Sequence, residues 1–339
     1  MNKEQSLTVA VLGGGSWGTA LAKLLSDKGY HVKMWLHEES VKNEINNEKE
    51  NITFLPGFKL SDNLVATNNI KEAIKDVDML LSVVPSQFVR KIFTEIKEDI
   101  PLYIPIVSAT KGVELETSFL ISEILEDVLH ERYHYYLTFL SGPSFAKEVA
   151  SGHPTLVTVA SINKKLAKRV QEIFSTQFFR AYTSNDVVGV EIGGALKNVI
   201  AIGAGIIAGL GYGANTRSAL ITRGLANMTQ FAIKRGANPL TLSGLSGLGD
   251  LVLTSTSSLS RNWSVGNKLG KGEKIEDILK DMNMIAEGIE NSKSIYYAAQ
   301  KIGIEMPIFN TIYKILHEGL SVEEAGVELM TRDLKKEIV

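Results

Sequence analysis

The sequence predicts an α/β protein in which a doubly wound, mostly parallel sheet is followed by an all-α region. In the first half, short apolar runs alternate with helical patterns, as they do when helices cover both faces of a parallel sheet. From about Asp186 onward, strand-like runs fade and helical spacing dominates. We therefore expect two domains, residues 1–186 and residues 187–339.

The expected elements follow from the position of each apolar run. The chain shows no internal repeat and no low-complexity linker, so we expect the two domains to pack tightly. The expected strands cover residues 8–12, 31–36, 78–84, 103–108, 136–140 and 156–160, with a helix at 19–25 after the first strand. The expected helices of the second domain cover residues 187–207, 218–234, 263–269, 275–282, 291–301, 307–317 and 322–329.

Composition excludes several classes of protein. The 339 residues include no cysteine, which excludes a disulfide scaffold, Cys-ligated metal centres and a Cys nucleophile. The net charge of -2 gives no global attraction to nucleic acid, and no nucleic-acid partner is expected. The longest apolar stretch, residues 199–212, is shorter than the ~20 residues of a membrane span, so no integral membrane segment is expected. The polar start, MNKEQSL, lacks the features of a signal peptide, which favours the cytoplasm.

A glycine-rich loop follows the first expected strand. Residues 13–18 read GGGSWG and fit the G-x-G-x-x-G pattern between a strand and a helix. The first glycine, Gly13, permits the tight turn, Gly15 lets a pyrophosphate approach the backbone, and Gly18 lets the helix pack on the strand. The helix N-terminus then favours the phosphates. The pattern predicts a dinucleotide site, and a turn without a ligand is the alternative.

The end of the second strand bears on the choice of cofactor. NAD enzymes usually place an acidic residue there to bind the ribose 2′-hydroxyl group. This chain has His37 and then Glu38. Because a histidine tolerates a 2′-phosphate while Glu38 could still serve NAD, we expect NADP to be favoured, with use of both cofactors. Alternatively, His37 is an exposed loop residue.

Two lysines occupy unusual positions. Lys197 lies in EIGGALKNVIAIGAGII, with small and apolar residues on both sides, and the polar Asn198 follows it. A lysine is almost never buried unless it is paired. It could reach the surface along its stem, or it could be a cleft lysine with a lowered pKa that serves in acid–base catalysis. Lys111 follows the strand at 103–108, at the sheet edge where doubly wound folds bind ligands, or it is a solvated loop lysine.

Further polar motifs lie along the chain. Gly142 and Ser144, in GPSFA, follow the next strand at the same sheet edge. The run Ser260, Arg261, Asn262 precedes a helical pattern and resembles an anion site. A plain helix cap followed by a surface arginine would give the same sequence pattern. Two more motifs complete the set: GLGD, which contains Asp250, and the pair Glu287 and Gly288. The pair could also be the ordinary start of a helix.

Taken in order, these motifs resemble a known family. The segments GGGSWGTALA, SATKG, LSGPSFAKE, GGALKN, GLGD, SRN and AEG are similar to those of bacterial-type NAD(P)-dependent glycerol-3-phosphate dehydrogenases, from Val9 to about Leu329. The resemblance implies a Rossmann-like N-terminal domain, a helical C-terminal domain and an active site between them. It also implies interconversion of sn-glycerol 3-phosphate and dihydroxyacetone phosphate, with a product that feeds glycerophospholipid synthesis. No metal is required. The oligomeric state stays open, and a homodimer is compatible with the sequence.

The resemblance also assigns roles to residues. By motif matching, Lys197 corresponds to the proton acceptor, and Lys111 adds positive charge beside the developing alkoxide. The family prefers Val where this chain has Ile285. The implied substrate contacts are Lys111, Gly142, Ser144, Lys197, Asp250, Ser260, Arg261 and Asn262. The implied cofactor contacts are Gly13, Gly15, Ser16, Trp17, Gly18, His37, Lys111, Ala146, Arg261, Ile285 and Glu287.

Two other functions remain open at this stage. One is a dehydrogenase of the same two-domain plan that acts on a carboxylate substrate, a β-hydroxyacid or ketopantoate. The other is a non-catalytic NAD(P)-binding sensor. A sensor would keep the glycine loop but would not need Lys197 or the SRN motif, so the presence of both favours an enzyme.

Overall fold

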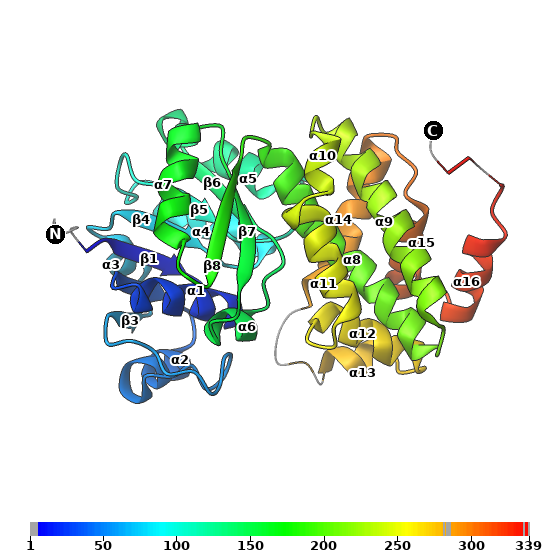
Figure 1. Cartoon of the computed structure of the whole chain (residues 1–339), viewed down its shortest axis with the longest axis horizontal. Coiled ribbons are helices and arrows are strands. Elements are labelled where there is room, and N and C mark those ends of the chain that lie inside the picture. The colour runs from blue at the N-terminus through cyan, green and yellow to red at the C-terminus, as the bar shows by residue number, and fades with distance from the viewer. Residues whose placement is uncertain (1–5, 281, 283–285, 335, 338–339) are drawn as a thin grey trace.

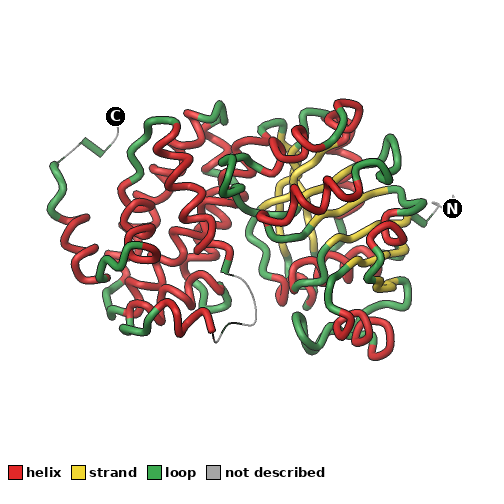
Figure 2. The backbone as a smooth tube through the Cα atoms, turned by 180° about the vertical axis from the view of Figure 1, so that it is seen from behind, coloured by secondary structure: helices red, strands yellow, loops and turns green. Residues whose placement is uncertain are grey.

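The computed structural model describes all residues except 1–5, 281, 283–285, 335 and 338–339. Its N-terminal half is a sheet with helices on both faces, and its C-terminal half is a bundle of helices beside that sheet (Figures 1 and 2). The expected fold class, a doubly wound sheet followed by an all-α region, is confirmed.

Eight strands form one sheet in the order β3-β2-β1-β4-β5-β6-β7-β8. The neighbours among β1 to β6 pair in parallel, β7 is antiparallel to β6, and β8 is parallel to β7. The order of the first six strands is that of a dinucleotide-binding sheet, with their carboxyl ends at one edge. The strands are β1 (Thr8–Leu12), β2 (His31–Trp35), β3 (Leu64–Thr67), β4 (Met79–Ser82), β5 (Ile106–Ser108), β6 (Leu137–Ser141), β7 (Thr155–Ala160) and β8 (Phe179–Ser184).

The strands expected at 31–36, 78–84, 136–140 and 156–160 differ from the observed ones by one or two residues at their ends, and three other strands differ more. The strand expected at 103–108 begins only at Ile106, because Tyr103 has a left-handed φ of 65° and Pro105 lacks an N–H group for the ladder. The sequence reading missed β3 and β8, the two edge strands of the sheet. In β8 the exposed Arg180 alternates with buried neighbours, so the strand has no continuous apolar run.

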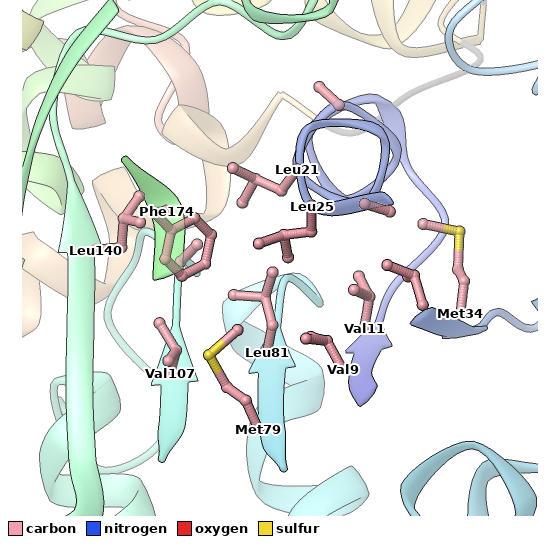
Figure 3. Close-up of a cluster of buried hydrophobic side chains, with 14 of the residues drawn as sticks. Val9, Val11, Leu21, Leu25, Met34, Met79, Leu81, Val107, Leu140 and Phe174 are labelled. Atoms are coloured by element: carbon pink, nitrogen blue, oxygen red, sulfur yellow. The ribbon is translucent and has the colours of Figure 1, made fainter. Parts of the chain in front are cut away.

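The sheet buries both faces. Along β1, Val9 and Val11 join the hydrophobic cluster on one face, together with Leu21 and Leu25 of α1 (Figure 3). Ala10 and Leu12 join the cluster on the opposite face. Such continuous burial explains why parallel strands read as apolar runs. The helices and turns of this half are α1 (Ser16–Asp27), α2 (Glu39–Asn43), η1 (Glu44–Glu48), α3 (Ile70–Ile74), α4 (Ser86–Ile96), α5 (Ile121–Val128), η2 (Glu131–Tyr136), α6 (Ala146–Ala150) and α7 (Lys164–Phe174).

The second half contains helices wherever helical spacing predicted them. Six of the seven expected ranges lie within observed helices; the range 275–282 runs past the end of α13, and residue 281 lies outside the described residues. The sequence reading missed α10, α11 and the π-helical turn η3. The elements are α8 (Val187–Gly209), α9 (Ala214–Lys234), α10 (Pro239–Leu242), η3 (Leu245–Gly249), α11 (Asp250–Thr256), α12 (Arg261–Gly270), α13 (Ile275–Lys280), α14 (Glu287–Lys301), α15 (Pro307–His317) and α16 (Val322–Met330).

The long helix α8 runs through the middle of the helical half. By length and composition it could cross a membrane, but 83% of its most apolar window is buried inside the protein. Its glycines allow other backbones to approach closely. A Cβ atom on Gly205 of α8 would lie 2.0 Å from the Trp263 carbonyl oxygen of α12. In return, a Cβ atom on Gly266 of α12 would lie 1.9 Å from the Ile202 carbonyl oxygen of α8. The glycine-rich sequence therefore serves helix packing.

The two halves share packed residues. Val113 and Leu120 follow β5 in the chain, yet they belong to the hydrophobic core of the helical half. The buried Glu191 of α8 accepts hydrogen bonds from the backbone N–H (3.0 Å) and the hydroxyl group of Ser122, at the start of α5. The segment after β5 is thus fixed to both halves.

The α8–α12 crossing yields a stability prediction. Gly266→Ala places a methyl group where the Ile202 carbonyl oxygen leaves no room, and overpacking of this kind costs about 1–3 kcal/mol. We expect the variant to unfold at lower urea concentration and lower temperature. Gly326→Ala, on α16, is the matched control, because no atom lies within 4 Å of its added Cβ atom. It should not lower stability, since alanine is about 1 kcal/mol more favourable than glycine in a helix. Equal or higher stability of Gly266→Ala would contradict the crossing geometry.

Candidate active site

The glycine loop connects β1 to α1. Gly13 has a φ of 117°, and its Cβ position would lie 2.9 Å from the Val83 carbonyl oxygen, so only glycine fits there. The Cβ position of Gly18 would lie 2.0 Å from the Gly13 carbonyl oxygen, so this glycine packs on the loop itself. The Cβ position of Gly15 faces open space. Gly15 is the N-cap residue of α1, and no side chain caps the amides of the first turn. The first amides of α1 are therefore available to an anion.

A cavity of about 1550 Å³ extends from this loop to the helical half. Most of the site residues expected from the sequence line it, although they come from segments far apart in the chain. Those lining it are Gly13, Gly15, Ser16, Trp17, Gly18, His37, Lys111, Ser144, Ala146, Lys197, Ser260, Arg261, Asn262 and Glu287.

Two of the expected residues that the structure describes are not among the lining residues. Gly142 lies behind the wall, where its carbonyl oxygen accepts hydrogen bonds from the Lys111 ammonium (3.2 Å) and the Ser144 hydroxyl group (3.0 Å). Asp250 is 1% exposed and also lies behind the wall. Ile285 lies outside the described residues.

Asp250 joins the two lysines. Its Oδ1 atom lies 2.9 Å from Nζ of Lys197, and its Oδ2 atom lies 2.6 Å from Nζ of Lys111. Lys197 comes from the buried middle of α8, and Lys111 comes from the loop after β5. The Lys197 ammonium also donates to the Thr254 hydroxyl group (2.8 Å), which in turn donates to the Asp250 carbonyl oxygen. Both lysines are paired and both line the cavity, so neither is a solvated surface lysine.

Burial sets the charge states of this group. Burial lowers the pKa of Lys197 to about 8, against the attraction of Asp250, and the neighbouring Lys111 lowers it further. Burial alone raises the pKa of Asp250, but the Lys111 and Lys197 ammonium groups outweigh it and hold the pKa below its ordinary value. The cavity wall therefore presents a lysine that changes protonation state near neutral pH beside a lasting carboxylate.

A second network holds the motif before α12. Ser260 caps α12, since its hydroxyl oxygen accepts the Trp263 N–H at 3.2 Å. The Asn262 amide donates to Oδ1 of Asn198 (3.0 Å) and accepts the Gly288 N–H (2.9 Å). This chain of contacts joins α8, α12 and α14. Burial raises the pKa of Glu287, against the attraction of Arg261 and both lysines.

The sequence reading missed several lining residues. Phe88 lies in α4 just beyond the carboxyl end of β4, and it is half exposed although it is aromatic. Lys91 lies one turn later on the same face, and Asn68 follows β3. Thr254, four residues after Asp250 on α11, was also missed. The position of α4 after an expected strand was the available signal for Phe88, whereas Asn68 had none because β3 itself was missed.

The cavity fits a dinucleotide. The loop amides suit its pyrophosphate, and the buried indole Nε1 of Trp17, on the cavity wall, has no hydrogen-bond partner among the described residues. His37 and Glu38, which follow β2 beside the strand that leads into the glycine loop, also line the cavity. Among the described residues no group of three or more His, Asp or Glu side chains could hold a metal ion.

Comparison with known proteins places this geometry in a family. Sequence models of NAD-dependent glycerol-3-phosphate dehydrogenase match residues 8–167, for its N-terminal part, and residues 186–326, for its C-terminal part.

The chain belongs to the NAD-dependent glycerol-3-phosphate dehydrogenase family.

Individual glycerol-3-phosphate dehydrogenases are similar over nearly their whole length. The enzyme of Citrifermentans bemidjiense, named as NAD(P)+-dependent, is 51% identical over 97% of this chain and 98% of its own. The crystal structure of the enzyme from Coxiella burnetii superposes with a TM-score of 0.92 at 38% identity, over 96% of this chain and 99% of that one. The enzyme of Plasmodium falciparum superposes with a TM-score of 0.86 at 26% identity, over 98% and 96% of the two chains.

Proposed function

We propose that this glycerol-3-phosphate dehydrogenase family member interconverts sn-glycerol 3-phosphate and dihydroxyacetone phosphate in the cavity described above. The observation that carries the proposal is the pair of lysines on the two oxygens of Asp250, on the same cavity as the glycine loop. The glycine loop would hold the nicotinamide cofactor, which would supply a hydride to substrate C2 as NAD(P)H in reduction and would accept it as NAD(P)+ in oxidation. The proton of the C2 oxygen is then handled by the side chains of this chain.

Lys197 is our candidate for the proton acceptor. With a pKa of about 8, its ammonium and amine forms are both accessible near neutral pH. In alcohol oxidation the neutral amine takes the hydroxyl proton while the C2 hydrogen leaves with its electron pair. In ketone reduction the ammonium returns the proton to the C2 oxygen. The Lys111 ammonium stabilises negative charge on that oxygen in both directions.

Asp250 acts through the lysines in this proposal. Both of its carboxylate oxygens bind ammonium groups, and it is buried behind the cavity wall. It therefore holds Lys197 and Lys111 in place and does not touch the substrate itself.

The start of α12 is our candidate for the phosphate site. Ser260, Arg261 and Asn262 line the cavity, and the helix N-terminus directs amide groups and the positive end of its dipole there. An arginine suits a phosphate because its guanidinium group donates two parallel hydrogen bonds. Anchoring the phosphate fixes C2 near Lys197, which contributes to the rate through orientation.

The family resemblance supports two further parts of the proposal, and His37 supports a third. The chain divides into a cofactor domain, residues 1–186, and a helical domain, residues 187–339. The enzyme works in the cytoplasm and supplies glycerol 3-phosphate to glycerophospholipid synthesis. NADPH is favoured over NADH, because His37 occupies the end of β2 where an acidic residue would repel a 2′-phosphate.

The reaction is tested with two ketones. The purified protein is expected to oxidise NADPH or NADH when dihydroxyacetone phosphate is added, and dihydroxyacetone is expected to be a poor substrate because it cannot use the site at Arg261. The measurement is the decrease of NAD(P)H absorbance with each ketone. Equal kcat/KM for the two ketones would remove the basis for the phosphate site, and no turnover of either would refute the proposed reaction.

The role of Lys197 is tested by Lys197→Met, which keeps most of the apolar stem and removes the charge. We expect the variant to fold and bind NADPH, while kcat falls roughly 10²–10⁴-fold, the usual contribution of an acid–base group. In the wild type, oxidation should speed up as pH rises through about 8, where the amine forms, and reduction should slow down. Lys165→Met, on the exposed face of α7, is the control. Near-wild-type kcat for Lys197→Met would refute the assignment.

Cofactor preference is tested by His37→Asp. The new carboxylate should accept the ribose 2′-hydroxyl group of NADH and repel the 2′-phosphate of NADPH, so the ratio of kcat/KM should shift toward NADH. His153→Asp is the control, because His153 is exposed and is not among the cavity-lining residues. An unchanged ratio in His37→Asp would show that His37 does not contact the adenosine end of the cofactor.

A further inference from the structure

Asn291 is a fully buried polar residue beside the site that the proposed chemistry does not use. It lies on α14, one turn after Glu287, and its exposed fraction is 0%. Its side chain does not line the cavity. An amide costs free energy to bury unless it is hydrogen-bonded, so its partners indicate why it is there.

The two ends of the Asn291 amide bind the two segments that carry the lysines. Its Oδ1 atom accepts the backbone N–H of Val113, and its Nδ2 atom donates to the carbonyl oxygen of Ala195, both at 3.4 Å. Val113 lies two residues after Lys111, and Ala195 lies two residues before Lys197. The Asn291 side chain thus connects the backbone segment that follows Lys111 to the backbone segment that precedes Lys197.

The Lys111 loop is held on its other side by the sheet domain. The Thr110 hydroxyl group donates to the Val84 carbonyl oxygen at 2.8 Å. At Gly112 the loop passes so close that an added Cβ atom would lie 2.4 Å from Oγ of Ser86 and 2.9 Å from Oδ1 of Asn291. The loop therefore cannot move toward α8 or away from it without changing its contact with Asn291.

Asp250 requires the two lysines to be placed precisely. Its carboxylate must reach both ammonium groups at once, at 2.6 and 2.9 Å. The two lysines belong to different halves of the protein, so their separation depends on contacts that cross between the halves. Asn291 supplies such a contact on each side of the pair.

We propose that Asn291 is a positioning residue, which holds the backbones beside Lys111 and Lys197 at the separation that lets both ammonium groups bind Asp250. The inference rests on the proposed function, because it concerns the two lysines assigned to the reaction. Asn291 itself touches neither substrate nor cofactor.

Loss of this contact should have a signature in the pH dependence. The charged groups facing Lys197 are Asp250 on α11, Lys111 after β5 and Glu287 on α14, and burial is the largest influence on its pKa. If the loop and α8 separate, water enters and Lys111 recedes. Both changes raise the pKa of Lys197 toward 10.5, its ordinary value, and they outweigh a weaker attraction to Asp250, which lowers it.

The experiment compares Asn291→Leu with Asn227→Leu. Asn227 is also buried in the helical half, on α9, and its Oδ1 atom has no hydrogen-bond partner among the described residues, so it matches the substitution without bridging the lysines. For Asn291→Leu we expect kcat to fall about 10–100-fold, as misplacement of about 1 Å does. The pH midpoint of alcohol oxidation should rise by roughly half a unit or more as burial is lost, while KM for NADPH stays within about threefold of the wild type because the glycine loop is unchanged.

A merely structural role would give a different result. Asn291→Leu would then leave the pH midpoint and kcat at the values of Asn227→Leu, whatever its melting temperature, and this outcome overturns the inference. Should Asn291→Leu fail to fold, Asn291→Ser gives the same comparison with less steric change. Wild-type protein is assayed beside the variants with dihydroxyacetone phosphate. Its failure to turn over would count against the proposed function, whereas an active wild type with control-like variants would count against Asn291 alone.

Discussion

The site depends on one buried carboxylate, Asp250, held between two ammonium groups. Removing a charge from water is expensive, and a buried ion pair is stable only when its geometry is good and its remaining bonds are satisfied. Here Lys111 and Lys197 bind the two carboxylate oxygens, and the Gly142 carbonyl oxygen and the Thr254 hydroxyl group accept further hydrogen bonds from the two ammonium groups. Two ammonium groups against one carboxylate leave one net positive charge beside the cavity. That charge favours a phosphorylated substrate and any negative charge that develops on its oxygen.

Glycines make this arrangement sterically accessible. The π-helical turn η3 leads directly into Asp250, and it packs on α8 where a Cβ atom on Gly193 would lie 2.4 Å from the Ser246 carbonyl oxygen. At Gly194 a Cβ atom would lie 2.5 Å from Oγ of Ser141 and 3.4 Å from Cγ of Lys111. Larger residues would push η3 and the Lys111 stem away from α8. The same composition that makes α8 resemble a membrane span thus brings three polar groups together.

The sequence predicted the features that a local pattern determines and missed those that depend on tertiary packing. Apolar runs and helical spacing predicted β1 and α15 closely, because burial on both faces or one face determines them directly. The edge strands β3 and β8 were missed because half of their residues face solvent. Most of the site residues that the motifs predicted, including Lys111 and Lys197, line the cavity. The shared carboxylate of Asp250 was not predicted, since no local pattern shows that two lysines 86 positions apart meet. Phe88 and Asn291 likewise depend on tertiary packing alone.

Packing between the halves also controls the chemistry. Lys197 has a pKa of about 8 chiefly because it is buried. Part of the protein around it comes from the cofactor half, through the Lys111 loop and the segment of Val113 that enters the helical core. If the two halves moved apart, water would reach the amine, its pKa would return toward the ordinary value, and the neutral form would become scarce near pH 7. In the proposed mechanism, the contact between the halves therefore determines whether Lys197 can exchange a proton with substrate, in addition to bringing cofactor and substrate together.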